Sequence, residues 1–356
     1  MFVKNLFAGK LAGVVPYKVD TNTYRVRLDA NESFFALPKQ LRLELENSLL
    51  DFNFNRYPDP DAVELVNAFC SFFGVSEKCV AAGNGSDEII SILMNCFIDF
   101  GSSVMTFTPD FSMYAFYARL AGAKVIECPK NKDLQIDFDA AIKQIKQNNV
   151  KLCIFSNPCN PTGKIEKKSD IITLASLCPD TIFVSDEAYM DFSPQDESFL
   201  KDTEKYSNII VLKTLSKAIG CAALRLGFVV ADESFIKMFK AVKSPYNVNG
   251  VSQKFGQIVL SHTELLTDCT NDIIRSVNQL SQMLNVQDTS NLFTFEKTYT
   301  NFLFMKSQKA KAVWEYLKSN GILVRYFDID GGALRITAGS MDENTQLCSY
   351  ISRFGG

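Results

Sequence analysis

The middle of the chain alternates between short apolar runs and helical patterns, and this alternation restricts the fold more than any other feature. The apolar runs are bounded by Gly, Pro, Asn or Asp, as is typical of strands buried on both faces. We expect strands at 78–82, 103–107, 123–128, 151–156, 181–185, 209–213 and 226–231, with helices between them, for example at 87–97 and 138–146. This layout predicts an α/β fold, with a three-layer αβα domain around a mostly parallel sheet.

The pattern changes after Ser244-Pro245. A long helical stretch is expected from about Val251 to Leu284, followed by strands at 299–305, 321–326 and 333–337 and helices near 309–320 and 341–353. We therefore expect a large domain over residues 40–245. A smaller α+β domain would follow over 246–356, joined by an N-terminal arm over 1–39 that also carries a helical pattern at 38–50.

Charge and cysteine content restrict the class of protein. The 356 residues include 37 basic and 40 acidic side chains without a basic block, which argues against nucleic acid as the main partner. Ten cysteines form no C-x-x-C pair, and most have apolar neighbours, as expected for thiols in a reducing compartment. No apolar run approaches the ~18 residues of a membrane span, and the N-terminus lacks a signal-peptide pattern. We expect a cytoplasmic protein that does not bind membranes.

The chain has a single histidine, His262, which excludes several chemistries. A multi-histidine metal site is impossible, and we predict no metal. A Ser-His-Asp triad would need this residue, and no G-x-S-x-G elbow is present. Within S-H-T-E, between two helical patterns, His262 is expected at a helix end or on the surface. Acid–base chemistry must therefore fall to Lys, Tyr, Asp or Glu.

Lys217 follows a strongly apolar strand in the segment T-L-S-K. A lysine near the end of a buried strand is costly unless it is deprotonated, paired or covalently used, and it can form a Schiff base with an aldehyde. Thr214, Ser216 and Arg225 nearby are donors suited to a phosphate. Together these residues suggest pyridoxal phosphate, although a lysine alone would more often be a solvated surface charge.

Other polar motifs follow the expected strands. In A82-G-N-G-S-D-E88 the glycines and the start of a helix could hold an anion, although Ser86 or Asp87 could simply cap that helix. The motif is not the full dinucleotide fingerprint, because position 88 is Glu.

Asp186 ends a buried strand, where a cation such as a protonated pyridine nitrogen would offset the cost of its charge. Tyr189 would lie on the same face of a helical turn and could donate to a ring oxygen. Asn160, in the N-P-C-N-P-T-G turn, could do the same, and Phe111 could stack on a flat ring. Alone, Asn160 could be a turn residue and Phe111 a core residue.

The order of G-N-G-S-D-E, P-D-F, N-P-T-G, D-E-A-Y and S-K…R resembles the fold-type I pyridoxal-phosphate aminotransferases, most closely the histidinol-phosphate aminotransferase branch. The resemblance extends from 28–32 and 56–59 to 334–339. It implies that Lys217 binds the cofactor covalently and carries the proton. Asp186 would pair with the ring nitrogen, Tyr189 and Asn160 would bind the ring oxygen, and Phe111 would stack on the ring. The implied phosphate contacts are Gly85, Ser86, Asp87, Thr214, Ser216 and Arg225.

The resemblance also implies a homodimer, in which Tyr57 of R-Y-P-D reaches the cofactor phosphate of the neighbouring subunit. Arg335 would grip an anionic group of the substrate, with Arg325, Tyr17 and Asn31 as further substrate contacts. The segment N31-E-S-F-F differs from the usual N-E-N-P form, and the spacing between the two arginines is shorter than is typical. Both departures concern the substrate and not the cofactor chemistry.

The expected reaction converts histidinol phosphate and 2-oxoglutarate to imidazole-acetol phosphate and glutamate, so the partners are a small amino donor and a 2-oxo acid. Alternatives with the same cofactor residues are a threonine-phosphate decarboxylase and a broad aromatic or amino-acid aminotransferase. A different class would be a cofactor-binding regulator without turnover. The sequence has no basic helix to support such a regulator, and it lacks the G-K-[ST] of a P-loop.

Overall fold

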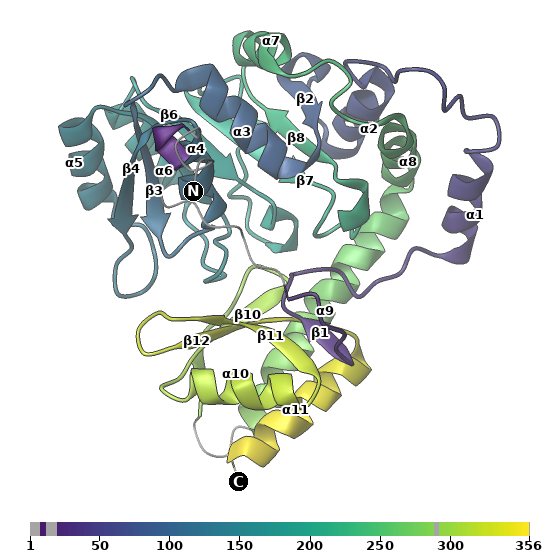
Figure 1. Ribbon diagram of the computed structural model, residues 1–356, viewed down its shortest axis with the longest axis vertical. Coiled ribbons are helices and arrows are strands. Elements are labelled where there is room, and N and C mark those ends of the chain that lie inside the picture. Colours follow the sequence, from purple (N-terminus) through teal and green to yellow (C-terminus); the bar gives the residue numbers. More distant parts are fainter. Residues whose placement is uncertain (1–7, 12–19, 288–291, 356) are drawn as a thin grey trace, which may run out of the picture.

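The computed structural model describes residues 8–11, 20–287 and 292–355. Two sheets dominate it, and the long helix α9 (Thr263–Gln287) runs from the larger α/β part to the smaller part (Figure 1). Within the described ranges no helix is long and apolar enough to cross a membrane.

The larger sheet has seven strands in the order β2-β8-β7-β6-β5-β3-β4. In chain order they are β2 (Val80–Gly83), β3 (Ser103–Thr108), β4 (Lys124–Pro129), β5 (Val150–Ser156), β6 (Ile182–Asp186), β7 (Ile209–Thr214) and β8 (Gly227–Val230). Every strand expected in this region is confirmed to within two residues. β8 pairs antiparallel with β2 and β7, and the other pairs are parallel, so the mostly parallel sheet is confirmed.

Helices cover both faces of this sheet, which gives the three layers predicted. Alternate residues of one strand point to opposite faces, so Val211 belongs to one hydrophobic cluster, while Ile210 and Leu212 belong to the other. The first cluster includes residues from α1 (Lys39–Asn47), α2 (Val63–Phe73), α5 (Phe138–Asn148), α6 (Lys168–Leu177) and α8 (Gly250–Ser261). The second includes residues from α3 (Gly85–Phe97), α4 (Met113–Leu120) and α7 (Glu233–Val242).

The smaller sheet has five strands in the order β1-β11-β12-β10-β9. They are β1 (Val26–Leu28), β9 (Thr294–Phe295), β10 (Phe302–Lys306), β11 (Ile322–Phe327) and β12 (Ala333–Thr337). Its core is completed by α9, α10 (Ala310–Ser319) and α11 (Met341–Gly355). β1, in the N-terminal arm, pairs parallel with β11 and is thus the edge strand of this sheet. The exact domain boundaries stay a prediction.

The long helical stretch expected from about Val251 to Leu284 consists of two helices. α8 ends at Ser261, α9 begins at Thr263, and His262 is the C-cap between them. The His262 Nε2 lies 2.9 Å from a carboxylate oxygen of Glu44. His262 is thus at a helix end, as the S-H-T-E context predicts. Short 3-10 helices complete the described chain at Gly9–Leu11, Glu77–Cys79, Met190–Phe192 and Ala222–Leu224.

Candidate active site

A cavity of about 950 Å³ lies between the two sheets, at the carboxyl ends of β5, β6 and β7. Ligands of open α/β sheets bind at such edges. Most of the predicted site residues line it: Asn31, Ser86, Asp87, Phe111, Asn160, Asp186, Tyr189, Thr214, Ser216, Lys217, Arg225, Arg325 and Arg335. Gly85 and Tyr57 do not line this cavity of the single chain. Tyr17 lies outside the described residues.

Lys217 lies in the turn that follows β7, with its amine directed into the cavity wall. The Nζ donates to the carbonyl oxygens of Ala30 (3.1 Å) and Asn31 (3.2 Å), which come from the N-terminal segment. Burial and then the positive charge of Arg335 lower the pKa of Lys217 to about 8. A lysine with this pKa has a substantial neutral fraction near neutral pH, as a nucleophilic or basic lysine requires.

Asp186 is the last residue of β6 and is 5% exposed. The hydroxyl of Tyr114 donates to its Oδ2 (2.8 Å), and the N–H of Ala188 donates to its Oδ1 (3.1 Å). Neither donor carries a charge, and burial raises the pKa of Asp186 to about 6. A buried carboxylate of this kind is suited to a cationic ligand atom, since a cation would offset the desolvation of its charge.

Tyr114 contributes to the site although the sequence analysis gave it no role. It is fully buried in the first turn of α4, and its ring meets that of Phe111 edge-on, with centroids 5.4 Å apart. The spacing of three residues from Phe111 is one signal that could have suggested a shared face. Its hydrogen bond to Asp186 joins the start of α4 to the end of β6, 72 residues apart in the sequence.

Tyr189 and Asn31 both line the cavity and are hydrogen-bonded to each other. The Asn31 side chain donates to the Tyr189 hydroxyl (2.8 Å) and accepts from the hydroxyl of Thr337 (3.1 Å). Burial raises the pKa of Tyr189 to about 12, so its hydroxyl stays protonated and able to donate. The expected helical turn between Asp186 and Tyr189 is wrong: Asp186 ends a strand, and Tyr189 lies in the turn that follows.

The start of α3 forms the part of the site that suits an anion. α3 begins at Gly85, and Asn84 before it makes no side-chain cap. Ser86 and Asp87 lie inside the first helical turn, so neither occupies the capping position that was the alternative for them. N–H groups at a helix start without a side-chain cap attract anions.

Two glycines allow other elements to approach this helix start closely. Gly85 has φ +82°, and a Cβ there would lie 2.6 Å from an Arg225 guanidinium nitrogen. A Cβ at Gly227 in β8 would lie 2.6 Å from the carbonyl carbon of Gly85. The hydroxyls of Thr214 and Ser216 are 3.0 Å apart and line the same cavity. Arginine, hydroxyl and helix N–H groups are the donors that phosphate prefers in proteins.

Arg325 and Arg335 are directly opposite each other in the antiparallel pair β11–β12, and both line the cavity. The Arg335 guanidinium also donates to the Asn160 side-chain oxygen (2.5 Å) and the Asp29 carbonyl oxygen (2.6 Å). Two guanidinium groups on one wall favour a substrate with anionic groups.

Tyr57 is 82% exposed, and its ring stacks on that of Tyr246 with centroids 4.7 Å apart. Within the described part of the chain, no cluster of three or more His, Cys, Asp or Glu side chains is arranged to hold a metal ion.

The chain matches the family Aminotransferase class I and II over residues 24–351. A histidinol-phosphate aminotransferase of Clostridium novyi is 38% identical over 351 residues, which cover 98% of this chain and 97% of that relative. Among solved structures, the histidinol-phosphate aminotransferase of Sinorhizobium meliloti in complex with pyridoxal-5'-phosphate has a TM-score of 0.88 at 21% identity, covering 98% of this chain and 96% of that one. The L-threonine-O-3-phosphate decarboxylase of Porphyromonas gingivalis shares the fold, with a TM-score of 0.79 at 24% identity over 92% of this chain and 99% of that one. With its lysine, buried aspartate and paired arginines in one cavity, the chain belongs to the aminotransferase class I and II family.

Proposed function

We propose that this protein is a pyridoxal-phosphate-dependent histidinol-phosphate aminotransferase. The observation that carries the proposal is that Lys217 shares one cavity with the buried Asp186 and with the opposed pair Arg325 and Arg335. Relatives that are at least 35% identical over almost the whole chain carry the name histidinol-phosphate aminotransferase.

The residues of the cavity fit pyridoxal phosphate. Asp186, whose two described hydrogen-bond donors are uncharged, would hold a protonated ring nitrogen. The start of α3, with Thr214, Ser216 and Arg225, would hold the phosphate, and Phe111 would cover the ring. When bound, the cofactor supplies an aldehyde for the amino group and a ring that withdraws electrons from the α-carbon.

Lys217 would move the proton at the α-carbon of the substrate. Its lowered pKa provides a neutral amine to remove that proton, and the resulting ammonium can return one. The only histidine does not compete for this role, because His262 is bonded to Glu44 at the end of α8 and does not line the cavity. Tyr189 and Asn160 would orient the ring through its oxygen.

The arginine pair suits both substrates of the proposed reaction. Histidinol phosphate carries a phosphate, and 2-oxoglutarate carries two carboxylates, and guanidinium groups bind each of these with paired hydrogen bonds. Asn31 borders the same wall through the hydrogen bond that it accepts from Thr337 of β12, the strand that carries Arg335. The thiols of all ten cysteines are free, as expected for the cytoplasm, which we propose as the location.

We also propose a homodimer in which Tyr57 completes the site of the second copy. The segment that carries it exposes large apolar side chains, since Leu50, Phe54 and Tyr57 are 80%, 71% and 82% exposed in the single chain. Contiguous exposed apolar side chains mark interaction surfaces. Tyr57 has no place in the cavity of its own chain, which leaves it available to a symmetric partner.

A half-reaction panel tests the substrate. The purified holoenzyme is mixed with histidinol phosphate, phenylalanine or phosphothreonine, and loss of the cofactor's Schiff-base absorbance is followed for each. We expect the largest kcat/KM for histidinol phosphate, with glutamate formed when 2-oxoglutarate is added. Release of carbon dioxide from phosphothreonine without glutamate would instead identify a decarboxylase, and a preference for phenylalanine would identify an aromatic aminotransferase.

A further inference from the structure

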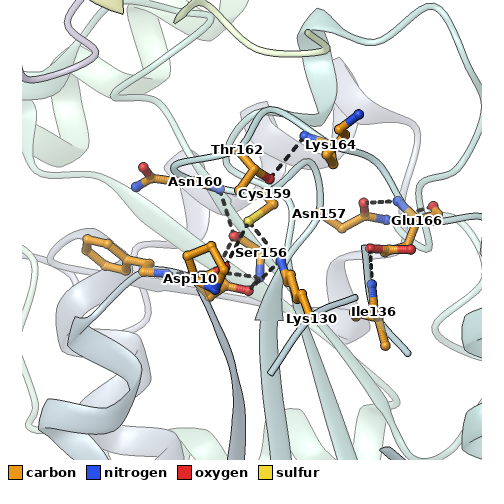
Figure 2. Close-up of polar contacts among 12 residues, drawn as sticks. Asp110, Lys130, Ile136, Ser156, Asn157, Cys159, Asn160, Thr162, Lys164 and Glu166 are labelled. Carbon is orange, nitrogen blue, oxygen red and sulfur yellow. Dashed lines mark hydrogen bonds and ion pairs between the residues drawn. The ribbon is translucent and has the colours of Figure 1, made fainter. Parts of the chain in front are cut away.

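A group of buried charged and polar side chains extends from the cavity wall, where Asp110 and Ser156 line the cavity, to Lys130 and Cys159; Figure 2 shows their polar contacts. The Lys130 ammonium lies 3.4 Å from an Asp110 carboxylate oxygen and 2.9 Å from the Cys159 sulfur. The side chains of Lys130 and Asp110 are each 1% exposed. The three residues come from the loops after β4, β3 and β5, so the group ties together three neighbouring strand ends.

Asp110 connects this group to two loops that line the cavity. Its Oδ1 accepts hydrogen bonds from the N–H of Phe111 (2.8 Å) and the hydroxyl of Ser156 (2.5 Å). The Ser156 oxygen in turn accepts the N–H of Asn160 (2.9 Å). The Asp110 carboxylate thus fixes the backbone of Phe111, the proposed ring-stacking residue. Through Ser156 it also fixes the backbone of Asn160, the proposed donor to the ring oxygen.

Lys130 is charged in this setting. Burial alone would lower its pKa, but Cys159 and Asp110 together raise it above the ordinary value. Burial raises the pKa of both the Asp110 carboxyl and the Cys159 thiol, and the positive charge of Lys130 lowers both. A buried carboxylate with no cation beside it would be costly and prone to protonation.

We propose that Lys130 is a positioning residue, whose buried ammonium keeps Asp110 ionised and so holds Phe111 and Asn160 in place against the cofactor ring. This inference rests on the proposed function. A purely structural role for the Lys130–Asp110 pair would affect stability alone, whereas a positioning role also affects the orientation of the bound cofactor.

The test is Lys130→Gln, which keeps hydrogen-bond donors and removes the charge. The matched control is Lys213→Gln, because Lys213 is also a buried lysine (side chain 2% exposed) paired with an acid, Asp191 (2.6 Å), but Asp191 does not line the cavity, whereas Asp110 does. For each holoenzyme, the visible circular dichroism of the cofactor, kcat, KM and the melting temperature are measured. Lys130→Met, which also removes the donors, serves as a second variant.

We expect both glutamine variants to lose stability, and Lys130→Gln alone to change the visible circular dichroism and lower kcat/KM by roughly 10- to 100-fold. A wild-type dichroic band and kcat in both Lys130 variants would overturn the inference, as would an equal change in Lys213→Gln. If the wild-type protein shows no Schiff-base absorbance with pyridoxal phosphate, the proposed function fails and this inference with it. A normal wild-type band with unchanged Lys130 variants contradicts only the inference.

Discussion

At the residue scale, the two central ionisable side chains of the site carry opposite pKa shifts with the same first cause. Burial raises the pKa of Asp186 and lowers that of Lys217, so it disfavours the charged form of each. The charged form of each side chain is therefore destabilised by its burial. A cationic ligand atom would stabilise the Asp186 carboxylate, and an aldehyde could react with the neutral amine of Lys217.

Asp186→Asn should stabilise the protein without cofactor and abolish most of its activity. The pKa of Asp186 is raised from 3.8 to about 6 in the folded state, so the folded protein binds more protons between those values and loses stability as pH rises through them. At pH 8 the variant should have a free energy of unfolding about 1–3 kcal/mol above that of the wild type. Activity should fall at least about 100-fold, because the ring nitrogen loses its counter-charge.

Urea unfolding of the two cofactor-free proteins at several pH values checks this account. The difference should shrink as pH falls below the folded pKa of about 6 and disappear below the unfolded pKa of 3.8, where Asp186 is protonated in both states. A difference that stays constant from acid to alkaline pH would show that the Asp186 charge is not its cause.

The sequence analysis identified candidate site residues that end a strand or follow one closely. It missed residues whose contacts with the site depend on the order of the strands in the sheet. Asn160, Asp186 and Lys217 were found because the carboxyl ends of parallel strands meet at one edge of a sheet. Tyr114 and Lys130 were missed because their partners lie across the sheet. The order β6-β5-β3-β4, which brings them together, is not encoded in the local sequence pattern.

At the scale of elements, the positions of the strands in the larger sheet were predictable from the sequence. The direction of β8 and the exact ends of α8 and α9 were not. β8 is antiparallel to its neighbours, and a short apolar run reads the same in either direction. The sequence placed His262 between two helical patterns, but the exact ends of α8 and α9 were not predictable, because apolar residues continue at helical spacing on both sides of it. The close contact between β8 and the start of α3 also could not be predicted from the sequence, because the two elements are far apart along the chain.

Gly227→Ala should weaken cofactor binding through the contact between β8 and α3. The new Cβ would lie 2.6 Å from the Gly85 carbonyl carbon and 2.8 Å from the Ser86 nitrogen, both backbone atoms that cannot move alone. Displacing the helix start should raise the Kd of pyridoxal phosphate roughly tenfold or more and lower stability by about 1–3 kcal/mol.

Gly9→Ala is the matched control, because a Cβ at Gly9 meets no atom within 4 Å. Fluorescence titration with pyridoxal phosphate measures both variants. Equal affinities for the two would argue against the helix start as the phosphate site.

At the scale of the whole molecule, the cavity is formed between two sheets, the larger with a hydrophobic cluster on each face and the smaller with a cluster of its own. The larger sheet supplies the lysine and the proposed cofactor contacts, and the smaller sheet supplies the arginine pair. The N-terminal segment closes the cavity by presenting its carbonyl groups to Lys217. If the arginine pair binds the substrate as proposed, substrate specificity depends on how the smaller sheet is placed against the larger one.

Mixing two impaired variants tests whether each site of the proposed dimer includes Tyr57 of the other subunit. Lys217→Ala and Tyr57→Phe are each expected to be impaired, and in a mixed dimer one site combines the wild-type Lys217 of one subunit with the wild-type Tyr57 of the other. Activity should rise on co-refolding, approaching the level of one site per mixed dimer. No recovery, with mixed dimers shown by native mass spectrometry, would place Tyr57 outside the neighbouring site.

The central claim is that Lys217 binds the cofactor, and reductive trapping tests it most directly. The holoenzyme is reduced with borohydride, digested, and mapped by tandem mass spectrometry, which locates the phosphopyridoxyl group on one lysine. We expect the group on Lys217, and its loss in Lys217→Ala. Labelling of Lys213, Lys130 or another lysine, or no labelling of the wild-type protein, would contradict this account.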